Sequence, residues 1–474
     1  MGDLTIAAIG QADDCVLVSD CPVKLQCLMY STSLHCNRQH VQLVPEKTRL
    51  LVWSPPSQKL YTHLAKLQCP IVVEGQTIDY VDSAEHVGIR RSSTGGNMPH
   101  IIDRIAAHSR AMGALLQAGA ARHHGANPSS SLHLEKLYGS SVLFSGSASL
   151  VLNKKEMNTL SQHHRRTICR LQKLPENTPD CVIFFLAGRL PAPAILDLRM
   201  LSLLGMIARL GPTALIQKVG RHMIISRNNK SWFNKVQSLC SDYHLPNPLQ
   251  LFQNPPSKES WKNMCKSKVI SFWEDKLRLE AEHLSSLHFF KPQFLSLARP
   301  HPMWTAPDNS HEVKKAVTVA SMLSGRYVTD HRARHWSRTN PEGFCHLCMA
   351  ASKAQDDHPR EDSILPVGSL THLLLECPEL HQPRDVVRSL WNDYTLDKPI
   401  IREIIFSYQN EPSIPSNWNP EIQLLLDPTV CPSVISASQT HGAGILHHIL
   451  YLTRTWCHSL HSRRQQLLKL LNVI

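Results

Sequence analysis

The sequence has no long apolar run and no recognisable secretory signal. Its longest apolar stretches, such as Val182 to Ala187, fall far short of the roughly 18 residues that span a membrane. Met1-Gly2-Asp3 lacks the basic start of a signal peptide, and Ile6 breaks a myristoylation motif. We therefore expect no membrane partner and an intracellular protein of the nucleus or cytoplasm, with its 14 cysteines reduced and available to metals.

Acidic residues are the minority charge. Lys and Arg number 50 against 38 Asp and Glu, which gives a net charge of +12. Between Glu85 and Glu135 the only acid is Asp103, and none follows Asp427. This balance favours a polyanionic partner, nucleic acid ahead of a membrane. The length of 474 residues and the 42% hydrophobic content allow roughly three packed domains.

An acidic turn lies close to the N-terminus. Two apolar runs, Leu4 to Ile9 and Cys15 to Val18, flank Ala12-Asp13-Asp14 and predict two strands joined by a tight hairpin turn. Adjacent carboxylates repel each other, so a site that keeps both ionised usually supplies a hard cation such as Mg²⁺. An ordinary acidic turn is the alternative interpretation.

Three further segments follow this turn in order. Pro22 to His40 has helical spacing, and Val41 to Trp53, which contains Lys47-Thr48, predicts a loop running into a strand. A hairpin turned by Glu74-Gly75 comes next, and its continuation ends in a hydrophobic-Gly-hydrophobic triplet around Gly88.

This ordered set resembles the last palm motifs of reverse transcriptases from non-LTR, LINE-type retrotransposons. The resemblance implies an RNA-directed DNA polymerase that uses two metal ions, in which Asp13 and Asp14 hold Mg²⁺. It also implies that Lys47 lies at the nucleotide triphosphate and that Gly88 lies in the primer grip. Gln11 and Val44 depart from the residues that the family often has at these places.

The family's active site also needs an aspartate from an earlier palm strand and the fingers that bind template. Because neither precedes Asp13 here, we expect a truncated or domesticated C-terminal portion that is inactive alone. Polymerase and endonuclease portions would then be missing from its front. The alternative is a non-catalytic module that binds RNA and DNA, the template and primer of the parent enzyme.

The helical middle of the chain is basic. Ile101, Ile105, Met112 and Leu116 share one helical face, and Arg104 and His108 lie on the other. Such residues would neutralise phosphates in a thumb that rests on the template–primer duplex, although a solvated basic face is the bland alternative. The candidate nucleic-acid contacts are Arg90, Arg91, Arg104, Arg110, Arg122, Lys154, Lys155, Arg165, Arg166, Arg463 and Arg464.

Two glycine motifs in this middle region also resemble thumb signatures of the family. Leu137-Tyr138-Gly139 and Leu186 to Pro191 each contain a glycine that would permit close packing, and Ile195 to Leu210 predicts a core helix. The tryptophans of the middle region are expected to be structural anchors rather than base-stacking platforms: Trp232, Trp261, Trp273 and Trp336.

A cysteine–histidine set follows. Cys345 and Cys348 are separated by two residues, and His372 and Cys377 are close enough in sequence for a slightly distorted helical turn to join them. Together they can form a Cys₃His zinc site. The set resembles the C-terminal zinc knuckle of the same family, except that the insert from Met349 to Thr371 is long; we expect its charged part to loop out.

Alternatives exist for this set too: a free cysteine pair beside an amphipathic helix, or His346 or His381 as a substitute ligand. The terminal helix from Ile445 is apolar on one face and basic elsewhere. It is expected to dock on the knuckle or on RNA, with a membrane surface as the alternative.

The predicted fold class is α+β, a palm remnant followed by mainly helical parts. The predicted divisions are 1–95 for the palm remnant, 96–215 for the thumb, 216–340 for the connector, 341–380 for the knuckle and 381–474 for the C-terminal helices.

Overall fold

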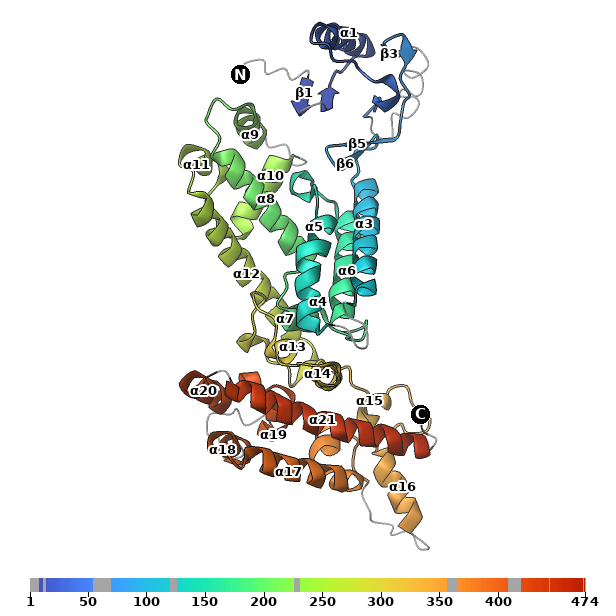
Figure 1. Ribbon diagram of the computed structural model, residues 1–474, viewed down its shortest axis with the longest axis vertical. Coiled ribbons are helices and arrows are strands. Elements are labelled where there is room, and N and C mark those ends of the chain that lie inside the picture. The colour runs from blue at the N-terminus through green and yellow to red at the C-terminus, as the bar shows by residue number, and fades with distance from the viewer. Residues whose placement is uncertain are drawn as a thin grey trace.

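The chain is arranged in three tiers along its long axis, as the computed structural model shows (Figure 1). Short hairpins and one helix form the N-terminal tier, a layer of helices forms the middle, and a second group of helices surrounds the long terminal helix. The structure describes residues 8–11, 14–53, 70–119, 126–225, 231–355, 365–407, 419–442, 444–471 and 473.

The strands of the N-terminal tier pair as antiparallel hairpins. They are β1 (Ala8–Gln11) with β2 (Asp14–Leu17), β3 (Val72–Val73) with β4 (Gln76–Thr77), and β5 (Ser83–His86) with β6 (Ile89–Ser92). The predicted helix is present as α1 (Pro22–Arg38), and the short helix η1 (Pro45–Lys47) follows. The strand predicted before Trp53 is reduced to a single bridge between Leu50 and Tyr80.

Glycine sets the turns of two hairpins. Glu74 and Gly75 have φ of 49° and 79°, and Val87 and Gly88 have φ of 49° and 72°. Two successive residues with positive φ are typical of the type I′ turn, whose twist matches the flanking strands. A Cβ on Gly88 would have no atom within 4 Å, so the backbone conformation, rather than crowding within the chain, explains this glycine.

The middle tier is a helical layer. Its main helices are α3 (Met98–Gln117), α4 (Pro128–Leu134), the π-helix η3 (Glu135–Gly139), α5 (Ser140–Leu143), α6 (Lys154–Leu171), α7 (Asp180–Ala187), α8 (Ala192–Ala208), α9 (Leu215–Ile225), α10 (Trp232–Asp242), α11 (Pro248–Gln253) and α12 (Lys258–Glu282). The predicted core helix is α8, which packs against α12. Trp261 donates through Nε1 to the carbonyl of Leu201 at 2.8 Å, and a Cβ on Gly205 would lie 2.1 Å from its ring, so only glycine admits the indole.

Helices α3 and α6 run side by side around buried polar residues. His108 is fully buried, and its Nδ1 lies 2.8 Å from Nε2 of His163 on α6. The prediction that His108 lies on the solvent side of α3 is therefore wrong. Gly139 approaches α3 closely, since a Cβ there would lie 3.0 Å from both His108 and Met112, as the packing interpretation of its motif predicted.

The buried carboxylate Glu135 holds this layer together. Its Oε2 lies 2.5 Å from Nη2 of Arg189, and Ser140 donates to its Oε1 at 2.7 Å. Burial alone would raise the pKa of Glu135, but the neighbouring His108 and Arg189 lower it to about 2. The ion pair of Glu135 with Arg189 thus links η3 to the α7–α8 connection, and the bond from Ser140 links it to α5.

The C-terminal tier follows α13 (Pro302–Thr305) and α14 (Ser310–Leu323). It contains α15 (Asp330–Ala333), α16 (His346–Gln355), the π-helix η7 (His372–Glu376), η8 (Pro378–Leu380), α17 (His381–Thr395), α18 (Pro399–Ser407), α19 (Pro420–Leu426), α20 (Pro432–His441) and α21 (Gly444–Leu470). Helix α21 is the axis of this tier and contacts α14, α17, α19 and α20 (Figure 1).

The chain is therefore rich in helix and has a few small antiparallel sheets, which agrees with the predicted α+β class at a coarse level. Its division into palm, thumb and connector stays a prediction. None of the described helices alone is long and apolar enough to cross a membrane; α7 and α8 meet that test only as a pair, and the pair is bent by 58°.

Candidate metal centre

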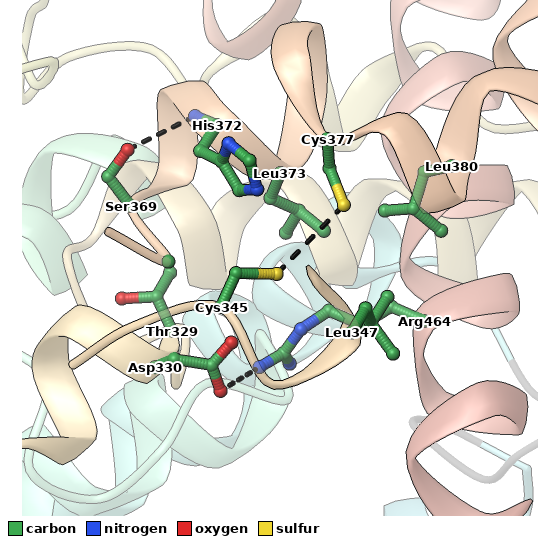
Figure 2. Close-up of a pocket in the computed structure, with 11 residues that line it drawn as sticks. Thr329, Asp330, Cys345, Leu347, Ser369, His372, Leu373, Cys377, Leu380 and Arg464 are labelled. Atoms are coloured by element: carbon green, nitrogen blue, oxygen red, sulfur yellow. Dashed lines mark hydrogen bonds and ion pairs between the residues drawn. The ribbon is translucent and has the colours of Figure 1, made fainter. Parts of the chain in front are cut away.

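Four buried side chains converge in the C-terminal tier, and they are the predicted set: Cys345, Cys348, His372 and Cys377. One ligand atom from each lies within 4.8 Å of the others. Two segments separated by the long insert supply them, the start of α16 and the η7 turn. Figure 2 shows Cys345, His372 and Cys377 pointing toward one another.

The spacing of these atoms fits a tetrahedral metal ion. Cys377 Sγ lies 3.9 Å from Cys345 Sγ and 3.8 Å from Cys348 Sγ, and Cys348 Sγ lies 3.4 Å from His372 Nε2. With Zn–S bonds of about 2.3 Å, tetrahedral geometry separates two sulfurs by about 3.8 Å. The cluster can therefore hold a metal such as zinc with little movement of its side chains.

Local structure sets the first ligand pair. Phe344 forms an isolated bridge with Val367, and the Cys345 amide donates to the Pro366 carbonyl at 2.9 Å. Helix α16 starts at the next residue, so Cys345 and Cys348 lie at its first turn. The sequence thus folds the Cys-x-x-Cys segment as a turn entering a helix, which presents both sulfurs on one side.

A π-helix brings the second pair together. The segment His372–Glu376 is the π-helix η7, and the amide of Cys377 donates to the carbonyl of His372 at 2.7 Å. This five-residue spacing of the hydrogen bond is the distortion of a helical turn that the sequence predicted. Carboxylate Oε2 of Glu376 lies 3.7 Å from His372 Nδ1, on the side of the ring away from the sulfurs. Such a partner favours ligation through Nε2.

The electrostatics of the cluster favour a thiolate. Hydrogen bonding from Cys377 lowers the pKa of Cys345 against the effect of burial, whereas burial raises the pKa of Cys348 and the bond to Cys345 raises that of Cys377. One sulfur is therefore charged at the expense of its neighbours. A divalent cation would relieve this competition, because it stabilises all three thiolates at once.

The carboxylate of Asp330 contacts the segment that carries Cys345 and Cys348. Asp330 Oδ1 lies 2.8 Å from His346 Nδ1 and accepts from Arg464 Nη2 at 2.9 Å (Figure 2). A Cβ on Gly368 would lie 2.6 Å from that of Asp330, so glycine is needed there. Because His346 is engaged by Asp330, and His381 Nδ1 lies 2.7 Å from the Pro378 carbonyl, neither is placed as a substitute ligand.

Two further helices contact the π-helix η7 and the residue after it. Trp456 of α21 donates to the Leu374 carbonyl at 3.2 Å, and Arg384 of α17 donates to the Cys377 carbonyl. The terminal helix thus contacts the segment that carries His372 and Cys377, in agreement with one of the two placements predicted for it. Asp330 and Arg384 were not singled out from the sequence, and Trp456 was expected only on the apolar face of the terminal helix. Asp330 and Trp456 lie far in sequence from the ligands they support, and nothing in the motif marks Arg384.

The remaining predicted positions are spread over the chain. Asp13 lies outside the described residues, as does the charged part of the insert at residues 356–364. Asp14 is exposed at the start of β2, and Lys47 is exposed at the end of η1. Within the described ranges no second group of metal-ligating side chains comes together, so the Mg²⁺ site stays a prediction.

The predicted basic contacts fall into two groups. Exposed side chains are those of Arg91, Arg110, Lys154, Lys155 and Arg166, and Arg463 is half-buried. Arg122 lies outside the described residues.

Other predicted contacts are used within the fold. Arg90 pairs with Asp103 and Arg165 with Asp180, while Arg104 is half-buried with its Nε enclosed. Arg464 is buried and pairs with Asp330, so it is not placed to touch a phosphate; this corrects its assignment as a nucleic-acid contact.

The tryptophans also divide. Trp261 and Trp273 are buried, and Trp232 is half-buried and donates to the Ala148 carbonyl at 2.7 Å, so the anchor prediction is confirmed for these three. It is wrong for Trp336, which is 61% exposed.

No protein-family model matches the chain, and no curated protein or solved structure matches it either. Any functional conclusion therefore depends on the site and on the motifs themselves.

Proposed function

We propose that this chain is a zinc-stabilised nucleic-acid-binding protein, the C-terminal portion of a reverse transcriptase of the non-LTR retrotransposon type. The convergence of Cys345, Cys348, His372 and Cys377 carries this proposal, because a buried Cys₃His set with tetrahedral spacing is typical of structural zinc. Zinc would contribute folding energy here rather than chemistry, since all four positions are filled by protein ligands.

Charge on two neighbouring helices supports nucleic acid as the partner. Two contacts show that helices α3 and α6 run in the same direction. The amide of Asn97, just before α3, donates to Glu156 early in α6, and His108 contacts His163 further along both helices. Exposed Arg110 and Arg166 lie beyond these contacts on the two helices. Such a surface would track a phosphate backbone without reading its sequence.

Binding and polymerisation are separate functions of the proposed ancestor. The exposed positions of Asp14 and Lys47 leave them accessible to nucleotide and metal. Primer extension on a primed RNA template with Mg²⁺ separates the two functions: extension that is lost in Asp14→Asn supports a polymerase, and background extension beside tight binding supports the binding module.

A salt titration tests the binding itself. Fluorescence anisotropy would follow a labelled RNA, a single-stranded DNA and an RNA–DNA hybrid, and log affinity should fall linearly with log salt by about 0.7 to 0.9 per phosphate contact. The double variant Arg110→Gln/Arg166→Gln should flatten this slope by about two such contacts. The matched control Arg402→Gln, an exposed arginine of α18, should leave it unchanged. A flat salt response of the native chain would refute the proposal.

A further inference from the structure

Trp336 lies exposed in the segment that leads into the metal cluster. Its side chain is 61% exposed, and among the described residues its indole has no hydrogen bond and no ring partner. An indole in water loses the burial that usually stabilises a large aromatic residue. Single exposed apolar residues are common on protein surfaces, so the neighbours of Trp336, rather than its exposure alone, indicate what it can bind.

Basic residues lie on both sides of Trp336 in the sequence. Arg334, His335 and Arg338 are exposed, and Arg332 is half-buried. Arg334 and Arg338 have no ion-pair partner in the part of the chain that the structure describes. The segment from 331 to 341 contains no acid; Glu342, which is exposed, is the first acid beyond it. Trp336 is therefore an exposed aromatic residue with one exposed arginine two positions before it and another two positions after it.

The loop that carries Trp336 is held on a rigid base. Thr329 Oγ1 accepts from the Arg332 amide at 3.2 Å and starts the short helix α15. At the other end, Asn340 is buried and makes two hydrogen bonds with the backbone of Phe344, at 2.7 and 3.0 Å.

Phe344 directly precedes the ligand Cys345, so the loop is tied to the Cys₃His cluster at this end. At its start, Asp330 ties the loop to His346 and Arg464. Hydrogen bonds thus hold the loop at both ends, and the side chains of Arg334, Trp336 and Arg338 between them are exposed to solvent.

We propose that Trp336, with Arg334 and Arg338, forms a base-stacking subsite for single-stranded nucleic acid. The inference rests on the proposed function and adds to it which strand type is held and by which residues. Every base offers a flat face, so an indole stacks on it without sequence preference, and the two guanidinium groups would meet the phosphates on either side. A duplex hides its base faces, so it cannot stack on Trp336.

The test measures the affinity of the full chain for three probes: a short oligothymidylate, its abasic counterpart of equal length, and a blunt duplex. Trp336→Ala should weaken binding of the oligothymidylate by about tenfold or more, because stacking of one base contributes that much, and should leave the abasic strand and the duplex unchanged. Trp336→Phe should retain most of the affinity. Tyr30→Ala, which removes an exposed aromatic of α1, is the matched control and should bind as the native chain does.

Zinc content checks that each variant keeps its fold. Because stacking is not ionic, Trp336→Ala should keep the salt slope, whereas Arg334→Gln/Arg338→Gln should flatten it. Equal affinity of Trp336→Ala and the native chain for the oligothymidylate would overturn the subsite and leave salt-dependent binding, and hence the proposed function, intact. Absence of binding to all three probes at low salt would overturn both.

Discussion

Arg464 of the terminal helix α21 donates to Asp330 across 2.9 Å, and both side chains are buried. The two residues are 134 positions apart in sequence, and Asp330 also engages His346 beside the metal ligand Cys345. The end of the chain is thereby joined to the Cys/His cluster. Stability of the cluster and docking of the helix should depend on each other.

The first prediction follows from this pair. Asp330→Ala should lower the free energy of unfolding by about 3–5 kcal/mol, since it leaves the Arg464 guanidinium buried without its partner. Urea unfolding measures the loss. Asp20→Ala, which breaks the exposed pair with Lys24, is the control and should change stability far less. Equal effects of the two substitutions would show that the buried pair is not important.

A double variant separates the buried charge from the structural link. Asp330→Ala/Arg464→Met removes both charges and should recover part of the lost stability, because no unpaired ion remains. If the double variant is no more stable than Asp330→Ala, the loss comes from the loop at His346 rather than from the orphaned guanidinium.

The second prediction concerns the metal. The purified chain should carry one zinc ion, and Cys348→Ser should lose it, because three ligands rarely hold a structural ion tightly. Elemental analysis counts the zinc, and thermal unfolding should shift downward in the variant and in the chelated native chain. Cys27→Ser, at an exposed free cysteine of α1, should keep the zinc. A native chain without zinc after gentle purification would reduce the cluster to buried thiols.

Short-range chemistry was predictable from the sequence, and long-range packing was not. Cys345 and Cys348 are three positions apart and His372 and Cys377 five, so their spacing alone indicates a shared ion. The type I′ turns at Gly75 and Gly88 are equally local.

The fate of individual charged and aromatic residues depends on partners distant in sequence. Arg464 was predicted to contact nucleic acid, but it pairs with Asp330, and His108 was predicted on the solvent side of its helix, but α6 covers it. Trp336 was predicted to be a structural anchor, yet its side chain is 61% exposed.

The third prediction tests the role of Gly88. Because its φ is 72°, Gly88→Val should destabilise the β5–β6 hairpin, whereas Gly88→Asn should be tolerated, since asparagine adopts the left-handed region more readily. Thermal unfolding of both variants measures this difference. If Gly88→Asn folds normally but loses binding to primed template, the glycine also faces the nucleic acid, as the primer-grip interpretation implies.

The last prediction concerns acid sensitivity. His164 is fully buried between Phe144 and Phe184, whose ring centroids lie 5.5 and 6.0 Å away, and both ring nitrogens lack a partner among the described residues. Burial lowers the pKa of His164 to about 4, from 6.5 in the unfolded chain. Between these values the unfolded state binds a proton that the folded state does not. Stability should therefore fall as pH drops from 6.5 to 4, by about 1.4 kcal/mol per pH unit for this one group.

His164→Phe removes the group that binds this proton and keeps an aromatic ring between Phe144 and Phe184. It should reduce the pH dependence of the unfolding free energy in this window by about one proton, and raise stability at pH 5, since two unsatisfied polar atoms are also removed. His163 and His458, whose pKa values burial also lowers to about 4, should account for much of the dependence that remains. His283→Gln, at an exposed histidine after α12, is the matched control for the loss of an imidazole ring. A slope as steep in His164→Phe as in the native chain would show that His164 is protonated in the folded protein.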